Sequence, residues 1–287
     1  MSQVRAIKHR HVMMPSLPRA CVLMPFRVGV PRLLCSWTTA ALLMAGCTSG
    51  RVTGPGAAGE GFGGVARPVH LIVIDAGHGG HDPGARYFGL EEKRLAFDVA
   101  KQLRDILKQT GFAVVMTREG DQFVPLSRRP EVANRLGADL FVSIHLNANP
   151  NRRVAGAEVY FPRESVVAPE ANWPPYLSAA EIGMPSAVVK QVLWDLVLQE
   201  TRAQSSQLAD RIAETLGRDL QASSTVKSAR FVVLREAWMP AVLVEVGYMS
   251  NRRESQRLAD AAYRRAAAQA IAEGIVSYVR ERGTHPI

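Results

Sequence analysis

Apolar residues in this chain occur in two patterns, short continuous runs and helix-spaced sets, and the two patterns alternate from residue 70 onward. A short, nearly continuous apolar run predicts a strand that is covered on both faces. Such runs occur at His70–Ile74, Ala113–Met116, Leu140–His145, Gly156–Phe161, Phe231–Leu234 and Ala241–Val246.

Between these runs, apolar residues three and four positions apart predict helices. One set ends before Gly111, a residue typical of a helix stop, and consists of Leu95, Val99, Leu103, Ile106 and Leu107. Further helices are predicted at Leu126–Leu136, Ser205–Leu220 and Ala261–Arg280. Alternating strands and helices indicate the α/β class: a single domain over 69–283, with a mixed, mostly parallel twisted sheet of about six strands and helices on both faces.

The segment 162–201 interrupts this alternation and predicts a helical insertion. Its first part is rich in proline, and its second part carries a helix-spaced apolar stripe of Val188, Val189, Val192, Leu193 and Leu196. A connection of this length is unusual in a compact domain and is often a lid over a functional site. A structural appendage without such a role is the alternative.

The N-terminal region has the pattern of an export signal. Residues 1–46 contain basic but no acidic residues, and an apolar stretch, Leu33–Leu43, is followed by small residues and Cys47. We therefore predict a lipoprotein-type signal peptide over 1–46, with Cys47 lipidated; cleavage without a lipid is the alternative. The Gly-, Ala- and Pro-rich stretch 47–68 predicts a flexible linker. The protein is then expected to be exported to the periplasm and anchored to the outer membrane through this lipid alone.

Charge and cysteine content narrow the function classes. The net charge of +9 comes largely from the leader, so the remaining chain is only weakly basic. This balance does not favour nucleic acid as a partner, but it is compatible with an anionic polymer. All three cysteines lie in the leader or at its end. The mature domain therefore has no disulfide framework and no thiol nucleophile.

Three polar side chains stand at or near the ends of predicted strands, where a plain core would not place them. His78 lies in the Gly-rich turn after the first strand, His145 ends another apolar strand, and Glu245 lies inside a third. Each residue alone has an ordinary structural explanation, such as a hydrogen-bonded His or an ion-paired Glu. Together, two His and a carboxylate are typical of a zinc site that leaves one position open for water. The sequence thus predicts a metal-dependent hydrolase.

A further ligand is expected at the start of the first long helix, where Glu91 and Glu92 follow the His78 turn. Either carboxylate could bind the metal. Both could equally serve only to stabilise the helix N-terminus through its dipole. Spacing alone does not distinguish these alternatives.

Four motifs, taken in order, resemble the zinc-dependent N-acetylmuramoyl-L-alanine amidases of the amidase-3 family. They are Asp75-Ala-Gly-His78-Gly-Gly, Glu92-Lys93, Ser143-Ile-His145-Leu-Asn-Ala and Pro240-Ala-Val-Leu-Val-Glu245-Val-Gly-Tyr-Met-Ser-Asn251. The resemblance covers roughly residues 69 to 282. It implies one Zn²⁺ per chain, held by His78, Glu92 and His145, with Glu245 as the catalytic general base. It also implies peptidoglycan as the substrate, and cell-wall remodelling with daughter-cell separation as the role.

The intervening positions are assigned less directly. Arg118, Arg128 and Asn147 are expected to contact substrate, with a scaffold role as the alternative for the first two. Ala76 stands where the family commonly has Pro, which should alter the turn little. His81 and Asp82, although close to His78, are predicted to be exposed loop residues.

The resemblance also implies regulation, because some relatives of the cell-division type carry a helix that covers the metal. We expect 162–201 to form such a lid and an activator protein to displace it. Two other functions use similar residues: a zinc peptidase acting on peptidoglycan stem peptides, and a non-catalytic wall-binding or regulatory module of the same fold. A nucleotide-binding protein is disfavoured, because the Gly-rich turn lacks the spacing and the Lys of a phosphate loop.

Overall fold

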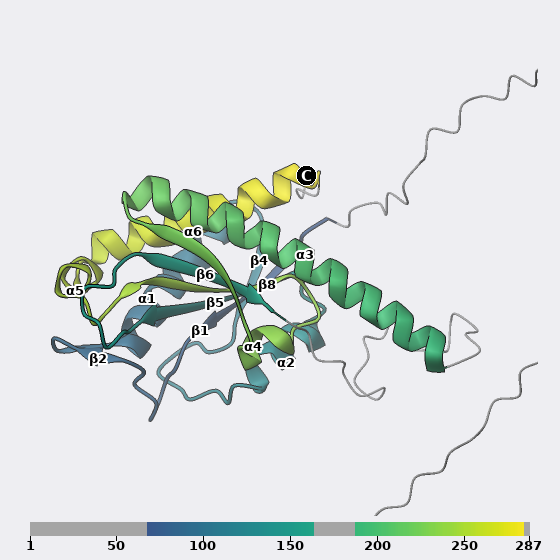
Figure 1. Cartoon of the computed structure of the whole chain (residues 1–287), viewed down its shortest axis with the longest axis horizontal. Helices are drawn as coiled ribbons and strands as arrows, with labels where there is room; N and C mark the ends of the chain where they lie inside the picture. The colour runs from purple at the N-terminus through teal and green to yellow at the C-terminus, as the bar shows by residue number, and fades with distance from the viewer. Residues whose placement is uncertain (1–67, 164–186, 284–287) are drawn as a thin grey trace, which may run out of the picture. The chain divides into compact units, whose positions relative to one another are not determined.

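The structure is a computed structural model that describes residues 68–163 and 187–283 (Figure 1). These residues belong to one compact unit, Gly59–Ile287. The predicted signal peptide, Cys47, nearly all of the linker, and residues 164–186 of the predicted insertion lie outside the described residues. Within the described ranges, no helix combines the length and the apolar character needed to cross a membrane.

A six-stranded mixed sheet forms the centre of the domain, in the order β4-β1-β5-β8-β6-β7. Strands β4, β1, β5 and β8 run parallel, β6 is antiparallel to β8, and β7 is parallel to β6. This confirms the predicted mostly parallel sheet. The strands span Leu71–Ala76 (β1), Ala113–Met116 (β4), Leu140–Asn147 (β5), Ala157–Pro162 (β6), Ser224–Ala229 (β7) and Ala241–Tyr248 (β8). A separate small hairpin joins Arg86–Tyr87 (β2) to Leu90–Glu91 (β3).

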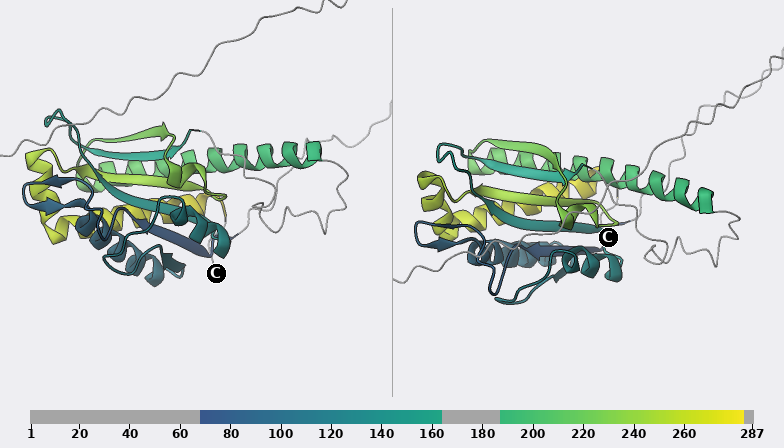
Figure 2. Two further views of the ribbon diagram at one scale, coloured as in Figure 1. Left: turned by 90° about the horizontal axis from the view of Figure 1, so that it is seen from below. Right: turned by 60° about the horizontal axis from the view of Figure 1, so that its bottom comes forward.

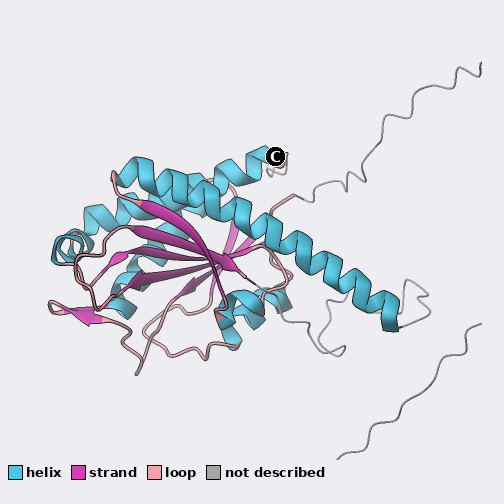
Figure 3. Ribbon diagram, viewed as in Figure 1, coloured by secondary structure: helices cyan, strands magenta, loops and turns pink. Residues whose placement is uncertain are grey.

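Helices cover both faces of this sheet, as predicted (Figures 2 and 3). One face packs against α1, α3 and α6, and the other against the short α2 and α4. The bounds are Glu92–Gln109 (α1), Arg128–Leu136 (α2), Ala187–Leu220 (α3), Val232–Arg235 (α4), Arg252–Ala259 (α5) and Ala261–Glu281 (α6).

The strands are apolar throughout because successive side chains point to opposite, covered faces. On β1, Ile72 and Ile74 join the large core under α1, α3 and α6, whereas Val73 joins the smaller core under α2 and α4. The same alternation on β8 directs Ala241 and Leu243 into the smaller core. Glu245 follows these two residues on the same strand face, which places its carboxylate on the side of α4.

One predicted strand is wrong, and one strand at the edge of the sheet was not predicted. Phe231–Leu234, predicted as a strand, is the start of helix α4, with Phe231 as its N-cap. The edge strand β7 was missed because its residues alternate between partly buried and exposed and include Lys227. A short apolar run fits a buried helix turn as well as a strand, so only packing distinguishes the two.

The predicted helix at Ser205–Leu220 is the second part of a much longer helix. Helix α3 begins at Ala187 and therefore includes residues 187–201 of the predicted insertion, whose first residue, Pro162, instead ends β6. Its first part extends beyond the sheet (Figure 1), yet Trp194 is fully buried and stacks edge-on against Trp238, with 6.3 Å between ring centroids. The first part of α3 is therefore joined to the domain by packing as well as by the chain.

Candidate metal centre

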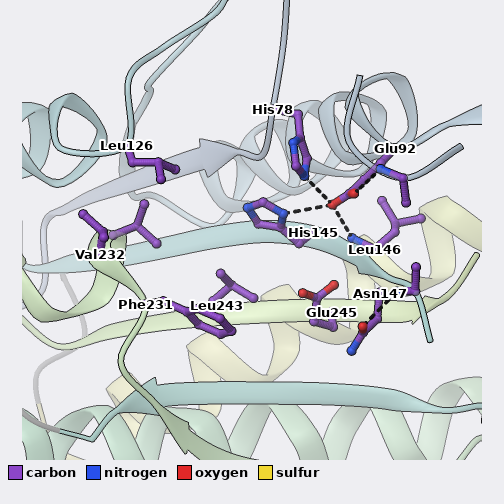
Figure 4. Close-up of a pocket in the computed structure, with 13 residues that line it drawn as sticks. His78, Glu92, Leu126, His145, Leu146, Asn147, Phe231, Val232, Leu243 and Glu245 are labelled. Carbon is purple, nitrogen blue, oxygen red and sulfur yellow. Dashed lines mark hydrogen bonds and ion pairs between the residues drawn. The ribbon is translucent and has the colours of Figure 1, made fainter. Parts of the chain in front are cut away.

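Four elements bring His78, Glu92, His145 and Glu245 into one pocket (Figure 4). His78 lies in the turn after β1, Glu92 is the first residue of α1, and His145 lies near the end of β5. Glu245 is the residue of β8 that pairs in register with His145. In open α/β sheets, the carboxyl ends of parallel strands are the usual place for a binding site.

The two imidazoles and the Glu92 carboxylate meet closely enough to share one metal ion. Glu92 Oε1 lies 3.0 Å from His78 Nε2 and 2.9 Å from His145 Nδ1. One ligand atom from each of the three residues lies within 4.8 Å of the others. The His rings are 4.9 Å apart, at 76° to each other. This set of donors could hold a metal.

The structure also distinguishes the two neighbouring glutamates. The Glu91 side chain forms ion pairs with Arg86 and Arg94 at the surface. Glu92 is buried, and its Oε2 accepts a hydrogen bond of 2.9 Å from the backbone N–H of Ala85. Glu92 is therefore the carboxylate that faces the two imidazoles.

Without an ion, these three side chains bind one another. Burial alone would raise the pKa of Glu92, but hydrogen bonds from His145 and His78 outweigh it and hold that pKa well below its usual range. Burial likewise opposes the charged forms of the two His, yet the contact with Glu92 raises the pKa of both. Because a metal ligand must give up its proton, a cation bound here competes with protons.

Glu245 is the unsatisfied group of the site. Burial is the main cause that raises its pKa to about 7; the charges of Glu92 and Glu158 add to this, and His145 opposes it. Its Oε2 atom is buried without a hydrogen-bond partner among the described residues. A buried, unpaired carboxylate oxygen is costly unless a ligand or a reaction uses it. A carboxylate that titrates near neutral pH is suited to general acid–base catalysis.

The turn that presents His78 requires glycines around it. A Cβ on Gly77 would lie 2.4 Å from the His145 ring, and one on Gly84 would lie 2.6 Å from both Glu92 Oε2 and His78 Cδ2. His78 itself has φ of 57°, which is unfavourable for a residue with a side chain. The surrounding structure must therefore hold this backbone in place.

Buried arginines provide that support. Arg129 on α2 donates to the carbonyl of His78 (3.0 Å) and to Asp75 Oδ1 (2.9 Å). Arg118, only 2% exposed, donates to the carbonyl oxygens of Ala76 and Gly77, at 2.9 Å each. Arg118 was predicted to contact substrate, with scaffold as the alternative; its burial and its carbonyl partners favour the scaffold role.

Asp82 corrects one prediction, because its side chain contacts His78. His81 is exposed, as predicted, but Asp82 Oδ2 lies 2.7 Å from His78 Nδ1. This contact orients the ring so that Nε2 faces Glu92, as carboxylates behind metal-binding His commonly do. Sequence reasoning passed over Asp82 because its position in a Gly-rich turn gave no indication of where the side chain points.

The two remaining predicted substrate residues differ in location. Arg128 is exposed and forms an ion pair with Glu131, and it is not among the residues lining the pocket. Asn147 does line the pocket, and its Nδ2 donates to Glu158 Oε2 at 3.0 Å. Glu158, which no sequence motif indicated, pairs in register with Glu245 and is charge-compensated by Lys227.

The pocket, of about 290 Å³, has chemically different ends. Leu126, Phe231, Val232 and Leu243 line it on one side of His78, Glu92 and His145 (Figure 4). Asn147 and Ala148 line it on the other side.

Comparison with known proteins gives one consistent result. Residues 72–277 match the family Amidase_3, described as N-acetylmuramoyl-L-alanine amidase. Over 221 residues the chain is 38% identical to N-acetylmuramoyl-L-alanine amidase AmiA of Escherichia coli K12, covering 72% of this chain and 75% of the relative. It is 35% identical to N-acetylmuramoyl-L-alanine amidase AmiC of Neisseria meningitidis, covering 74% of this chain and 53% of that relative.

Solved structures agree with the sequence relatives. The chain resembles N-acetylmuramoyl-L-alanine amidase AmiC2 of Nostoc punctiforme, with a TM-score of 0.57, 35% identity, and coverage of 74% of this chain and 97% of that one. It also resembles the CwlD amidase of Clostridioides difficile in complex with the GerS lipoprotein, with a TM-score of 0.57, 26% identity, and coverage of 74% and 99%.

Proposed function

This chain belongs to the Amidase_3 family of N-acetylmuramoyl-L-alanine amidases, and from that membership we propose that it is a zinc-dependent enzyme of cell-wall remodelling and daughter-cell separation. Its reaction is hydrolysis of the peptidoglycan amide bond between N-acetylmuramic acid and L-alanine. We assign His78, Glu92 and His145 as the ligands of one zinc ion and Glu245 as the general base.

The observation that carries the proposal is the meeting of these four side chains in one pocket. Two imidazoles and one carboxylate are a donor set that zinc prefers in catalytic sites. Beside them, the buried Oε2 of Glu245 lacks a hydrogen-bond partner within the described part of the chain. The residues present therefore fit the metal and leave a carboxylate for the reaction.

Each side chain then has a distinct task. Zinc, when bound, supplies a Lewis acid that activates water and polarises the substrate carbonyl. Glu245 Oε2 takes a proton from the attacking water and passes it to the nitrogen of L-alanine as the amide bond breaks. The water oxygen thus becomes part of the lactyl carboxyl group, and the L-alanine nitrogen, with the transferred proton, becomes the free amine of the peptide. Asp82, Arg118 and Arg129 hold the His78 turn so that this arrangement persists.

The test is fragment analysis. Purified protein is incubated with peptidoglycan before and after complete removal of metal, and the products are weighed by mass spectrometry. We expect glycan strands without attached peptide and free peptides that begin with L-alanine, with activity lost on chelation and restored by zinc. Peptides cut internally would instead indicate a zinc peptidase, and no products at all a non-catalytic module. Full activity without metal would refute the zinc assignment.

We also propose export and lipid anchoring, from the sequence pattern of residues 1–47. Cys47 is the proposed lipid-bearing first residue of the mature protein, held at the periplasmic side of the outer membrane. Mass analysis of the mature N-terminus checks this, with Cys47→Ser as the control. A wild-type protein that begins at Cys47 without lipid, or that begins elsewhere, would contradict the anchor.

Control by an activator protein acting on 162–201 is a further part of the proposal. The relative CwlD is in a complex with the lipoprotein GerS. In this chain, Val192 and Leu196 are 52% and 56% exposed on the first part of α3. Unpartnered apolar side chains of this kind suit the docking of another protein. Residues 164–186 of the proposed lid lie outside the described residues.

A deletion tests the lid, and the packing of α3 sets its bounds. Trp194 is fully buried against Trp238, so the deletion should end before α3. Replacing 164–186 with a short Gly/Ser linker should raise basal hydrolysis of peptidoglycan if this segment restrains the enzyme. The matched control, Val192→Asp with Leu196→Asp, should leave basal hydrolysis unchanged and abolish stimulation by the activator. Unchanged basal hydrolysis after the deletion would count against the lid.

A further inference from the structure

The polar end of the pocket continues into a basic surface. Two loops leave this end: 148–156 after β5, and 249–251 leading into α5. Over 148–156 and 249–253 there is no acidic residue, but there are four arginines. All four are exposed, and none forms an ion pair within the described residues: Arg152, Arg153, Arg252 and Arg253.

Hydrogen bonds fix the two loops to each other. Asn251 Nδ2 donates to the carbonyl of Arg152 at 3.1 Å, and the backbone N–H of Asn149 donates to Ser250 Oγ at 2.9 Å. The buried carboxylate of Glu254 accepts from the backbone N–H of Gly156 at 2.9 Å. Loops held in this way lose little conformational entropy when a ligand binds. The guanidinium groups are therefore carried on a preorganised frame.

A third element borders the same surface. The guanidinium carbon of Arg252 lies 5.8 Å from the ring centre of Phe88, at the tip of the β2–β3 hairpin. Glu92 follows this hairpin directly. Asn147 comes just before the loop 148–156, and Glu245 lies on the strand that leads to 249–251. The basic surface is thus built from the continuations of the same segments that carry the site.

The distance from the pocket suits a short peptide. Arg152 is four residues beyond Ala148, which lines the pocket, and Arg252 is four residues beyond Tyr248, the register partner of Asn147. Four residues span at most about 14 Å. This span is an upper limit, so an extended peptide of four or five residues, attached at the scissile bond, is long enough to reach these arginines.

We propose that Arg152, Arg153, Arg252 and Arg253 form a binding surface for the anionic peptide stem of the substrate. The muramoyl group then lies toward the apolar end, against Leu126 and Phe231. This inference rests on the proposed amidase function and adds the direction in which the substrate lies. The muramoyl side of the bond is uncharged once its lactyl acid is an amide, whereas the peptide side carries free carboxylates. Arginine is suited to such groups because its planar fork binds a carboxylate through two hydrogen bonds.

The experiment compares two soluble muramoyl peptides, one with free stem carboxylates and one with those carboxylates converted to amides. The enzyme is the full-length chain with zinc, either wild type or with all four arginines replaced by Gln. For wild type, we expect kcat/KM to be about tenfold higher on the acidic substrate, and higher salt to reduce this preference. The four-Gln variant should lose the preference through a higher KM, with kcat nearly unchanged.

Two further variants test whether the preference depends on positive charge at these four positions, rather than on a folding defect or on the overall charge of the protein. Arg→Lys at the same four positions keeps the charge but not the fork, so most of the preference should return. Lys108→Gln with Arg280→Gln removes exposed charges from the last turns of α1 and α6, the ends of these helices away from Glu92 and from α5, and should leave the preference intact.

The outcomes are distinct. A wild type that cleaves both substrates equally well overturns the proposed surface but not the amidase function. A wild type that cleaves neither at the muramoyl–alanine bond refutes the function itself. An equal loss on both substrates in the four-Gln variant overturns the surface as a stem site. The surface is also overturned as a stem site if the four-Gln variant keeps the preference for the acidic substrate but no longer binds vesicles of phosphatidylcholine with phosphatidylglycerol. That result would assign these arginines to membrane binding.

Discussion

The two faces of the central sheet differ in what they bury. Under α1, α3 and α6, the strands contribute Ile72, Ile74, Val142 and Val244 to a continuous apolar core. Under α2 and α4 the apolar core is smaller, and Asp75, Ser143 and Arg129 are buried beside it. These polar groups support the His78 turn, and the pocket opens on the same face. The larger apolar core and the polar groups that support the His78 turn thus lie on opposite faces of one sheet.

This difference follows from what each face must do. An apolar core tolerates many side chains of similar size, whereas a catalytic site needs defined orientations. Buried hydrogen-bonded charges supply orientation, but they are costly to bury and depend on each other. We therefore expect substitutions on the α2/α4 face to change chemistry and metal binding as well as stability, and those in the core under α1, α3 and α6 to change stability alone.

The largest effect is expected for Glu245→Gln. Removing a general base commonly costs about 10²- to 10⁴-fold in rate. Because Glu245 is not one of the proposed ligands, zinc content should stay at that of the wild type. The measurements are kcat on muramoyl peptides and metal analysis of the purified variant. Loss of zinc would show that Glu245 is a ligand.

The buried pair of Arg129 and Asp75 comes next. Arg129→Met leaves Asp75 charged and without its ion-pair partner, which should cost about 3–5 kcal/mol of the free energy of unfolding. Zinc affinity should fall as well, because the His78 carbonyl loses its donor. Urea unfolding and competition with a chelator measure the two effects.

The neighbouring Arg128 provides a matched control. Arg128 is exposed, so Arg128→Met should change the free energy of unfolding by no more than about 0.5 kcal/mol. Equal effects of the two substitutions would contradict the role assigned to Arg129.

A pH effect of intermediate size is expected in the metal-free protein. The pKa of Glu245 is raised to about 7 by burial, whereas the unfolded chain releases this proton near its ordinary value of 4.5. The native state therefore keeps this proton up to a higher pH than the unfolded state does. Its stability accordingly falls as pH rises from about 4.5 to 7. Between pH 5 and pH 8, Glu245→Gln should gain up to about 3 kcal/mol relative to wild type. A difference between the two proteins that does not change with pH would contradict the burial of this charge.

The smallest effect is expected in the core under α1, α3 and α6. A Cβ on Gly274 of α6 would lie 2.7 Å from the Cα of Ile212, so Gly274→Ala forces α6 and α3 apart. It should cost about 1–3 kcal/mol of the free energy of unfolding, with zinc affinity and kcat unchanged. In Gly217→Ala the new Cβ meets its nearest atoms at 3.6 Å, so this control should be neutral or slightly stabilising. A change in zinc affinity caused by Gly274→Ala would show that the two faces are coupled.

Much of the fold could be predicted because its signals are local. The apolar runs of β1, β5 and β8 and the helix-spaced residues of α1 and α6 reflect periodicities that the chain carries by itself. His78, His145 and Glu245 could be identified because each is a polar residue in or directly after an apolar run. Strand β7 and helix α4 were less predictable, because both depend on which residues the neighbouring elements cover.

Sequence by itself determined the fold class, the order of the elements and the residue types available for chemistry, because these follow from short-range patterns. Tertiary structure alone decided that Glu92 rather than Glu91 faces the imidazoles, that Asp82 orients His78, and that Arg129 supports the turn. Such contacts depend on the directions in which side chains point after folding. The side chains involved are far apart in the chain or lie within an irregular turn. Their energies come from burial and hydrogen-bond geometry, which no periodicity encodes.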